Sequence, residues 1–277
     1  MTRLVLLTGA TGFVGRQILR ALTAQGASVR TVIREGTVDK LKGVDSIEKL
    51  VTTPDLFAET SAWWAEACCR VDTIIHAAWY VEPPAYLYSP KNLDCLAGTL
   101  QLAKGAAAAG IRRFIGVGTC FEYDLTEGPL HTKTPLRPLT PYAGAKAAAF
   151  MALSQWFPQQ GVEFAWCRLF YLYGEGENNQ RFVSYLRARL TAGEPAELTS
   201  GKQVRDFLDV RQAGRMIVDA ALGSEQGPVN ICSGAPISVK QLAEQIADEF
   251  GRRDLLLFGA RPDNPIDPPS IVGIRLI

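Results

Sequence analysis

A tyrosine and a lysine four residues apart, in Tyr142-Ala-Gly-Ala-Lys146, are the side chains in this sequence best suited to chemistry. On a helix this spacing places both side chains on one face. A neighbouring ammonium favours the ionised phenol and lowers its pKa towards neutral pH, which suits a group that gives and takes a proton. Pro141 is well tolerated in the first turn of such a helix. Without further motifs, the same spacing is equally typical of a surface tyrosine and a solvated lysine with no catalytic role.

A glycine-rich loop near the N-terminus gives the pair a context. Residues 4–7 are apolar and indicate a strand, and a helical pattern follows the loop. Gly9 permits a tight turn, Gly12 lets backbone N–H groups approach a pyrophosphate, and Gly15 permits close helix packing. The predicted dinucleotide-binding residues of this loop are Gly9, Thr11, Gly12, Phe13, Val14 and Gly15. The alternative is a glycine turn without a ligand.

The two motifs together predict hydride chemistry on a carbonyl or an alcohol. A nicotinamide carries the hydride, and a phenol held near a lysine carries the accompanying proton. Thr119 follows a predicted strand at residues 114–117. Because the carboxyl ends of parallel strands line the ligand crevice, Thr119 is placed to hydrogen-bond a substrate oxygen.

The end of the second predicted strand, at residues 28–34, selects between the two nicotinamide dinucleotides. An NAD site usually places an acidic residue there, at the adenosine ribose. This chain has Arg34, whose guanidinium can bind a 2′-phosphate through two hydrogen bonds. We therefore favour NADP(H), with further positive charge at Lys40 and Lys42. The alternative is NAD(H), with Arg34 solvated and Glu35 or a backbone group holding the ribose.

Five further residues are candidates for the site. Four of them have a structural role as the alternative, and for the fifth, His76, a packing role is expected. Asp55 and Leu56 either meet the adenine edge or belong to an ordinary loop. His76 ends an apolar strand and is expected to pack near the cofactor. Trp79 forms a wall of the substrate pocket or packs in the core. Asn92 supports Lys146 from behind or caps the following helix.

Composition excludes several classes of protein. The chain has 277 residues, 47% hydrophobic and 21% charged, with a net charge of +1, so neither nucleic acid nor a membrane surface is expected as a partner. No leader or transmembrane stretch is evident, which predicts a cytoplasmic protein. Six scattered cysteines are expected to be reduced thiols, and two histidines make a zinc site improbable.

Alternating strands and helices predict an α/β fold with a doubly wound (Rossmann) parallel sheet. Strands are expected at residues 4–7, 29–33, 71–75, 114–117 and 164–169, and helices at 95–109, 143–156, 182–192, 210–222 and 238–250. Ser238 and Gln241 form a capping box at the last helix. We assign residues 1–168 to a dinucleotide-binding domain and residues 169–277 to a smaller substrate-binding lobe.

The chain resembles the extended short-chain dehydrogenase/reductase family, in its branch of nucleotide-sugar epimerases, dehydratases and reductases. The resemblance covers nearly the whole chain and rests on the glycine loop, Thr119, the Tyr142 and Lys146 pair, Asp72-Thr-Ile-Ile-His76-Ala77-Ala78, Asn92, Arg168-Leu-Phe-Tyr-Leu-Tyr-Gly174 and Arg205-Asp-Phe-Leu-Asp209. It implies that Tyr142 is the general acid/base, that Lys146 positions the nicotinamide ribose and tunes Tyr142, and that Thr119 binds the sugar oxygen. Ala77 is expected to contact the cofactor.

The resemblance also implies a site for a nucleotide sugar. Arg205 and Arg261 match arginines that grip the nucleotide diphosphate, although each is alternatively a surface charge or an ion-pair partner of Asp206 or Asp263. The remaining predicted substrate residues are Trp79, Cys120, Phe121 and Tyr171. Tyr171 replaces the family's usual asparagine, and Gly118 replaces its serine before Thr119.

One difference from the family's sequence pattern reduces the number of reactions that this chain could catalyse. Members that dehydrate a hexose carry an Asp-Glu pair after the catalytic Ser/Thr, where this chain has Cys120 and Phe121. A thiol and a phenyl group cannot do carboxylate acid/base work, which disfavours a 4,6-dehydratase. Glu122 lies one residue later and is expected to be structural or an ion-pair partner.

We therefore predict NADPH-dependent reduction of a nucleotide-linked 4-keto-6-deoxyhexose. The alternatives are an NAD-dependent 4-epimerase on the same scaffold and a non-catalytic dinucleotide sensor, the latter disfavoured by the retained Thr119, Tyr142 and Lys146. The resemblance also implies a homodimer formed through the helices at 95–109 and 143–156.

Overall fold

A computed structural model describes residues 3–41 and 47–275 of the chain. Its largest element is a seven-stranded parallel sheet with the order β10-β6-β5-β4-β1-β2-β3. The strands are β1 (Leu4–Thr8), β2 (Ser28–Arg34), β3 (Ile47–Thr53), β4 (Thr73–His76), β5 (Arg113–Thr119), β6 (Glu163–Leu169) and β10 (Gly227–Ile231). The predicted α/β class with a doubly wound sheet is confirmed.

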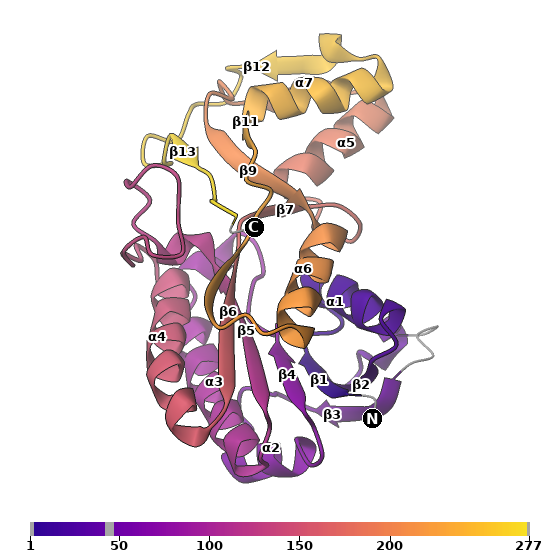
Figure 1. Cartoon of the computed structure of the whole chain (residues 1–277). Coiled ribbons are helices and arrows are strands. Elements are labelled where there is room, and N and C mark those ends of the chain that lie inside the picture. The colour runs from indigo at the N-terminus through magenta and orange to yellow at the C-terminus, as the bar shows by residue number, and fades with distance from the viewer. Residues whose placement is uncertain (1–2, 42–46, 276–277) are drawn as a thin grey trace.

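Helices cover both faces of this sheet because its strands are apolar on both sides. Helices α1 (Phe13–Ala24) and α6 (Val210–Leu222) lie on one face, and α2 (Ser61–Ala67), α3 (Lys91–Ala108) and α4 (Pro141–Trp156) lie on the other (Figure 1). Along β1, Val5 and Leu7 pack with the first group, whereas Leu6 packs with the second. The site is therefore built on a sheet buried on both sides.

A smaller lobe stands at the carboxyl ends of the strands (Figure 1). It holds a four-stranded sheet of β7 (Tyr171–Tyr173), β9 (Val204–Asp209), β11 (Pro236–Ser238) and β13 (Ser270–Ile271), the pair β8 (Ala196–Leu198) and β12 (Leu256–Phe258), and the helices α5 (Phe182–Ala192) and α7 (Val239–Phe250). Leu186, Leu190 and Ile246 are central to its core. The sequence predicted these helices and none of the lobe strands, which except for β9 have only two or three residues.

The chain after residue 168 does not stay in the smaller lobe. Strand β10 pairs with β6, and α6 packs against α1, so both belong to the large sheet and its helical layer. The division at residue 168 stays a prediction. None of the helices in the described ranges is long and apolar enough to cross a membrane.

Local signals set the helix boundaries. Helices α5 and α6 have the predicted bounds. Helix α7 begins with the predicted capping box, in which the N-cap Ser238 and the third helical residue, Gln241, exchange hydrogen bonds of 3.0 and 3.1 Å. Helix α4 begins two residues earlier than expected because the Thr140 side chain accepts from the Ala143 N–H at 3.2 Å. Short 3₁₀ turns occur at η1 (Val38–Leu41), η2 (Ala85–Leu87), η3 (Cys120–Glu122), η4 (Phe157–Gln160) and η5 (Arg253–Leu255).

Candidate active site

A cavity of about 840 Å³ opens at the carboxyl ends of the large sheet, beside the smaller lobe. Every predicted cofactor residue lines it: Gly9, Thr11, Gly12, Phe13, Val14, Gly15, Arg34, Asp55, Leu56, Ala77 and Lys146. The predicted substrate residues that also line it are Trp79, Thr119, Cys120, Phe121, Tyr142 and Tyr171. The structure thus brings the two predicted groups into one space, while their roles stay predictions.

The glycine loop joins β1 to α1 by a turn that only small residues allow. Gly9 has φ +76°, and a Cβ there would lie 2.7 Å from the Ala78 backbone nitrogen. A Cβ on Gly15 would lie 1.9 Å from the Gly9 carbonyl oxygen. The Gly12 N–H donates to that same oxygen at 2.9 Å, and α1 begins at the next residue. The positive end of α1 therefore faces the cavity, which fits a dinucleotide pyrophosphate.

Arg34 ends β2 at the rim of the cavity and is exposed. Within the described ranges, no carboxylate lies within ion-pair distance of its guanidinium. Lys40 lines the same end of the cavity, whereas Lys42 lies outside the described residues. The Asp55 side chain accepts from the Phe57 N–H at 3.0 Å, so it is oriented by its own loop. The end of the cavity at β2 thus carries two cations, Arg34 and Lys40, together with the Asp55 carboxylate.

His76 lies beneath the cavity as a packing residue. Its Nδ1 is 2.8 Å from the Thr8 hydroxyl, and its Nε2 is 2.9 Å from the Thr99 hydroxyl. Burial lowers the pKa of His76 to about 3, and the nearby charge of Lys146 acts in the same direction. The imidazole is therefore neutral, as expected of a residue that packs near the cofactor rather than transferring protons.

Tyr142 and Lys146 are both buried on the face of α4 that meets the cavity. The Tyr142 ring packs edge-on against Tyr86, with ring centroids 5.0 Å apart. The predicted lowering of the Tyr142 pKa is wrong for this structure: burial raises that pKa, and a hydrogen bond with Thr119 opposes the rise. Desolvation is the largest cause, and the charge of Glu122 raises the pKa of Tyr142 further, so the phenol is a protonated acid.

Glu122 holds the end of β5 in place. The chain turns into η3 after Thr119, so the strand does not continue and the Glu122 carboxylate folds back beneath it. It accepts from the Thr119 N–H at 2.8 Å, from the Trp166 indole at 3.0 Å and from Arg168 Nε at 2.7 Å. Glu122 and Arg168 are 0% and 1% exposed. This agrees with the expected structural ion pair.

The same arrangement accounts for the glycine before Thr119. A Cβ on Gly118 would lie 2.2 Å from the Trp166 indole nitrogen and 2.4 Å from Glu122 Oε1. The indole and the carboxylate therefore occupy the space that a serine side chain would need. The departure from the family pattern at Gly118 is linked to the presence of Glu122 and Trp166.

Cys120, Phe121 and Tyr171, three of the predicted substrate residues, line the cavity close to one another. Burial raises the pKa of the Cys120 thiol, so this side chain stays protonated. The Phe121 and Tyr171 rings meet edge-on, with centroids 6.1 Å apart. This part of the wall therefore consists of a thiol and two aromatic rings.

The two predicted diphosphate arginines do not line the cavity. Arg205 is 3% exposed, forms an ion pair with Asp267 at 2.7 Å and lies over the Tyr171 ring. Its partner is therefore not Asp206, which instead accepts from the backbone N–H groups of Ser233 and Gly234. Arg205 is separated from the cavity by Tyr171, which stacks on it.

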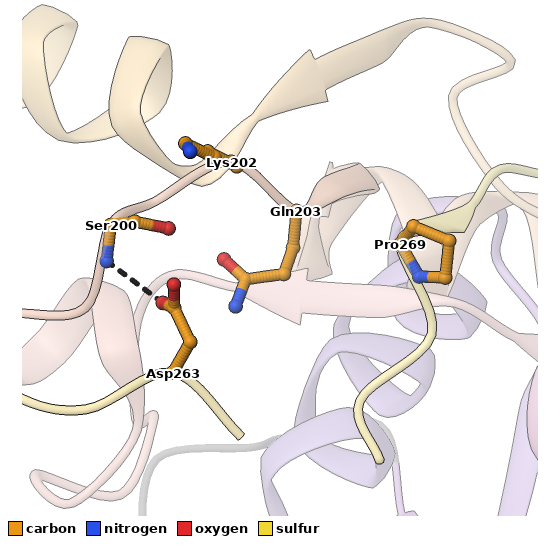
Figure 2. Close-up of a pocket in the computed structure, with 5 residues that line it drawn as sticks. All are labelled: Ser200, Lys202, Gln203, Asp263 and Pro269. Carbon is orange, nitrogen blue, oxygen red and sulfur yellow. Dashed lines mark hydrogen bonds between the residues drawn. The ribbon is translucent and has the colours of Figure 1, made fainter. Parts of the chain in front are cut away.

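Arg261 is exposed and stays in the smaller lobe. Its guanidinium lies over the Tyr185 ring and is 3.2 Å from the Tyr185 hydroxyl, with Glu197 3.9 Å away. Its alternative partner, Asp263, accepts from the Ser200 N–H at 2.9 Å instead. This bond closes one side of a small hollow of about 190 Å³, also lined by Lys202, Gln203 and Pro269 (Figure 2). The hollow contains none of the predicted site residues.

Sequence reasoning missed several of the side chains that line the cavity, Tyr86 and Arg181 among them, and was wrong about a helix cap at Asn92. Tyr86 and Arg181 line the cavity from a loop after β4 and from the residue before α5, where no local pattern singles them out. Asn92 does not cap α3, which begins after Pro90. Its Oδ1 accepts from the Trp79 indole at 2.9 Å, and that indole lies against the Lys146 ammonium, so the support of Lys146 from behind stays a prediction. No group of His, Cys, Asp and Glu in the described part of the chain is arranged to hold a metal ion.

The doubly wound sheet, with its cavity at the carboxyl ends of the strands, defines a dinucleotide-binding enzyme. Residues 5–232 match the NAD dependent epimerase/dehydratase family, and the chain belongs to it. The resemblance expected from the motifs is therefore confirmed, as is the class of NAD(P)-dependent oxidoreductases and epimerases.

Two relatives and one solved structure illustrate the range of the family. The chain is 24% identical to dTDP-6-deoxy-L-talose 4-dehydrogenase (NAD(+)) of Aggregatibacter actinomycetemcomitans, over 98% of this chain and 99% of the relative. It is 27% identical to GDP-6-deoxy-D-mannose reductase of Pseudomonas aeruginosa, over 90% of this chain and 80% of that relative. The same fold occurs in UDP-N-acetylglucosamine 4-epimerase from Methanobrevibacter ruminantium M1, which was solved in complex with UDP-N-acetylmuramic acid. The TM-score is 0.87 at 20% sequence identity, and the match covers 99% of this chain and 90% of the epimerase chain.

Proposed function

We propose that this chain reduces the C4 ketone of a nucleotide-linked 4-keto-6-deoxyhexose, with NADPH as the hydride donor. One observation carries the proposal: Thr119, Tyr142 and Lys146 share a cavity with the glycine loop, while Cys120 and Phe121 follow Thr119. Dehydration across two carbons needs a carboxylate acid and base, which these two positions lack. Reduction of a ketone needs one proton donor beside the hydride.

Tyr142, Thr119 and Lys146 each have a separate role in the proposed reduction. The bound nicotinamide supplies the hydride. Tyr142 donates the proton to the ketone oxygen, and burial, which raises the pKa of Tyr142, keeps the phenol protonated until transfer. The Thr119 hydroxyl hydrogen-bonds the same oxygen and polarises the carbonyl. Lys146 holds the nicotinamide ribose and offsets the negative charge that develops on Tyr142.

Two relatives support the substrate class, and the name of the first also supports reaction at C4. The names dTDP-6-deoxy-L-talose 4-dehydrogenase and GDP-6-deoxy-D-mannose reductase both describe oxidation or reduction of a nucleotide-linked 6-deoxy sugar. For the cofactor we favour NADPH because Arg34 offers an unpaired guanidinium at the rim, within the described ranges.

The test is turnover of dTDP-linked and GDP-linked 4-keto-6-deoxyhexoses with NADPH or NADH, followed by nicotinamide absorbance. We expect net oxidation of NADPH, and a loss of at least about 100-fold in kcat for Tyr142→Phe. The matched control is Tyr88→Phe, which removes a hydroxyl from an exposed tyrosine outside the cavity. Interconversion of C4 epimers by retained NAD, without net cofactor change, would replace the reductase by the epimerase.

A homodimer through α3 and α4 belongs to the same proposal. The outer faces of these two helices expose Leu93 and Met151 at 66% and 59%, among small residues such as Ala97 and Ala148. Such a face suits close packing of a second copy. We expect a light-scattering mass of two chains, reduced to one in Met151→Glu. A mass of one chain for the unmodified protein excludes the dimer.

A further inference from the structure

The Lys146 ammonium lies between two indole rings. Its Nζ is 3.9 Å from the ring centroid of Trp79 and 5.8 Å from that of Trp166. It also donates a hydrogen bond to the Val117 carbonyl. Lys146 is only 2% exposed, so little water reaches the charge. A carbonyl oxygen and two aromatic faces therefore surround the ammonium in place of solvent.

Each indole is held by a hydrogen bond from its own N–H. Trp79 donates to Asn92 Oδ1 at 2.9 Å, and Trp166 donates to the Glu122 carboxylate at 3.0 and 3.1 Å. Asn92 is fully buried, and its amide nitrogen donates to two backbone carbonyls of the preceding loop. The rings are thus fixed independently of Lys146, so the ammonium meets a surface that is already in place.

Few charges help to keep Lys146 protonated. Burial lowers the pKa of Lys146 to about 7, and the charge of Glu122 in η3 opposes this. Cys95 in α3 also faces Lys146, but burial raises its pKa to about 11, so it carries no charge at neutral pH. His76 in β4 is neutral as well. Because Glu122 already pairs with Arg168, the Val117 carbonyl and the indole face of Trp79 are the groups left to stabilise the ammonium.

We propose that Trp79 is a positioning residue for Lys146. The indole face of Trp79 keeps the Lys146 ammonium charged and fixed beneath the cavity. A cation over an indole face is stabilised by the ring quadrupole, more strongly than over a phenyl ring and most strongly where water is excluded. The inference rests on the proposed function, which gives Lys146 its role. It assigns Trp79 a task beyond that of a wall of the substrate pocket.

The direct test is an NMR pH titration of isotope-labelled lysine in the full chain, with the Lys146 signal assigned by Lys146→Arg. We expect the pKa of Lys146 to fall by about 0.5 to 1.5 in Trp79→Leu, and by less in Trp79→Phe, which keeps an aromatic face. The matched control is Tyr80→Leu, which removes a ring that lies over Lys91 instead. Equal Lys146 pKa values in the unmodified protein and both Trp79 variants would overturn the inference.

A kinetic readout separates positioning from pocket shape. In ketone reduction, we expect the alkaline limb of the kcat profile to move to lower pH in Trp79→Leu by the amount seen in the titration, and to be largely restored in Trp79→Phe. A change confined to KM, with no movement of the profile, makes Trp79 a pocket wall only and overturns the inference. If no keto-sugar is turned over by any of the proteins, the proposed function fails, whereas the lysine titration still decides the role of Trp79.

Discussion

The Glu122 carboxylate accepts the backbone N–H of Thr119 at 2.8 Å, so a fully buried charge fixes the residue that ends β5 beneath the cavity. The same carboxylate pairs with Arg168 at 2.7 Å. A buried pair of this kind adds little net stability over apolar residues, yet removal of one partner leaves the other charge uncompensated. The contact therefore couples the stability of the sheet to the position of Thr119.

Glu122→Gln is expected to lower the free energy of unfolding by about 3 to 5 kcal/mol, because it leaves the Arg168 guanidinium buried without a counter-charge. Urea denaturation measures the change. The matched control is the double variant Glu122→Gln with Arg168→Met, which removes both charges and should be more stable than Glu122→Gln alone. A single variant as stable as the unmodified protein would show that the pair is not buried in solution.

Arg34→Ala is expected to weaken NADPH binding by about 10- to 100-fold and to leave NADH binding nearly unchanged, because only NADPH carries a 2′-phosphate for the guanidinium. Calorimetric titration of the cofactor-free protein measures both affinities. Lys40→Ala, at the same rim, serves as the control for general positive charge and should have a smaller effect. Tighter binding of NADH by the unmodified protein would contradict the assignment.

The parts of the site that the sequence predicts are those with a local signal. Gly9 and Gly15 stand out because the turn and the close helix contact exclude a Cβ. Tyr142 and Lys146 stand out because helical spacing alone puts them on one face. Helices α5 and α6 have their predicted bounds because their ends are marked by Gly193 and by the Asp209 cap.

The parts that the sequence does not predict depend on contacts between distant segments. The partner of Arg205 is 62 residues away at Asp267, not its neighbour Asp206, because successive strand residues point to opposite faces. Tyr86 reaches Tyr142 only because its loop folds over the strand ends. The pKa of Tyr142 likewise follows from burial, which spacing along a helix cannot show.

In a Tyr171→Ala background, which removes the ring that separates Arg205 from the cavity, Asp267→Asn is expected to strengthen the binding of dTDP by roughly 3- to 10-fold. The change frees the Arg205 guanidinium for the diphosphate that the resemblance assigns to it. Calorimetric titration with dTDP measures the affinity. Asp263→Asn is the matched control, since its carboxylate accepts from the Ser200 N–H. An unchanged dissociation constant for Asp267→Asn in this background would make Arg205 a structural residue.

His76 gives the fold a pH dependence whose direction follows from its burial. Burial lowers the pKa of His76 from its usual 6.5 to about 3, so below pH 6.5 the unfolded chain binds a proton that the folded chain does not bind. Stability therefore falls as the pH falls from about 6.5 towards 3. Between pH 7 and pH 5, we expect the unmodified protein to lose about 2 kcal/mol more than His76→Gln, whose amide keeps a donor and an acceptor between Thr8 and Thr99.

Urea denaturation at the two pH values measures this difference directly. Lys146 and Glu177 also titrate near this range, since burial lowers the pKa of Lys146 and raises the pKa of Glu177, each to about 7. Both groups are present in both proteins, so their contributions cancel in the comparison. The same pH dependence in His76→Gln as in the unmodified protein would mean that the imidazole is protonated in the folded state, and therefore that it is not enclosed between the two threonines.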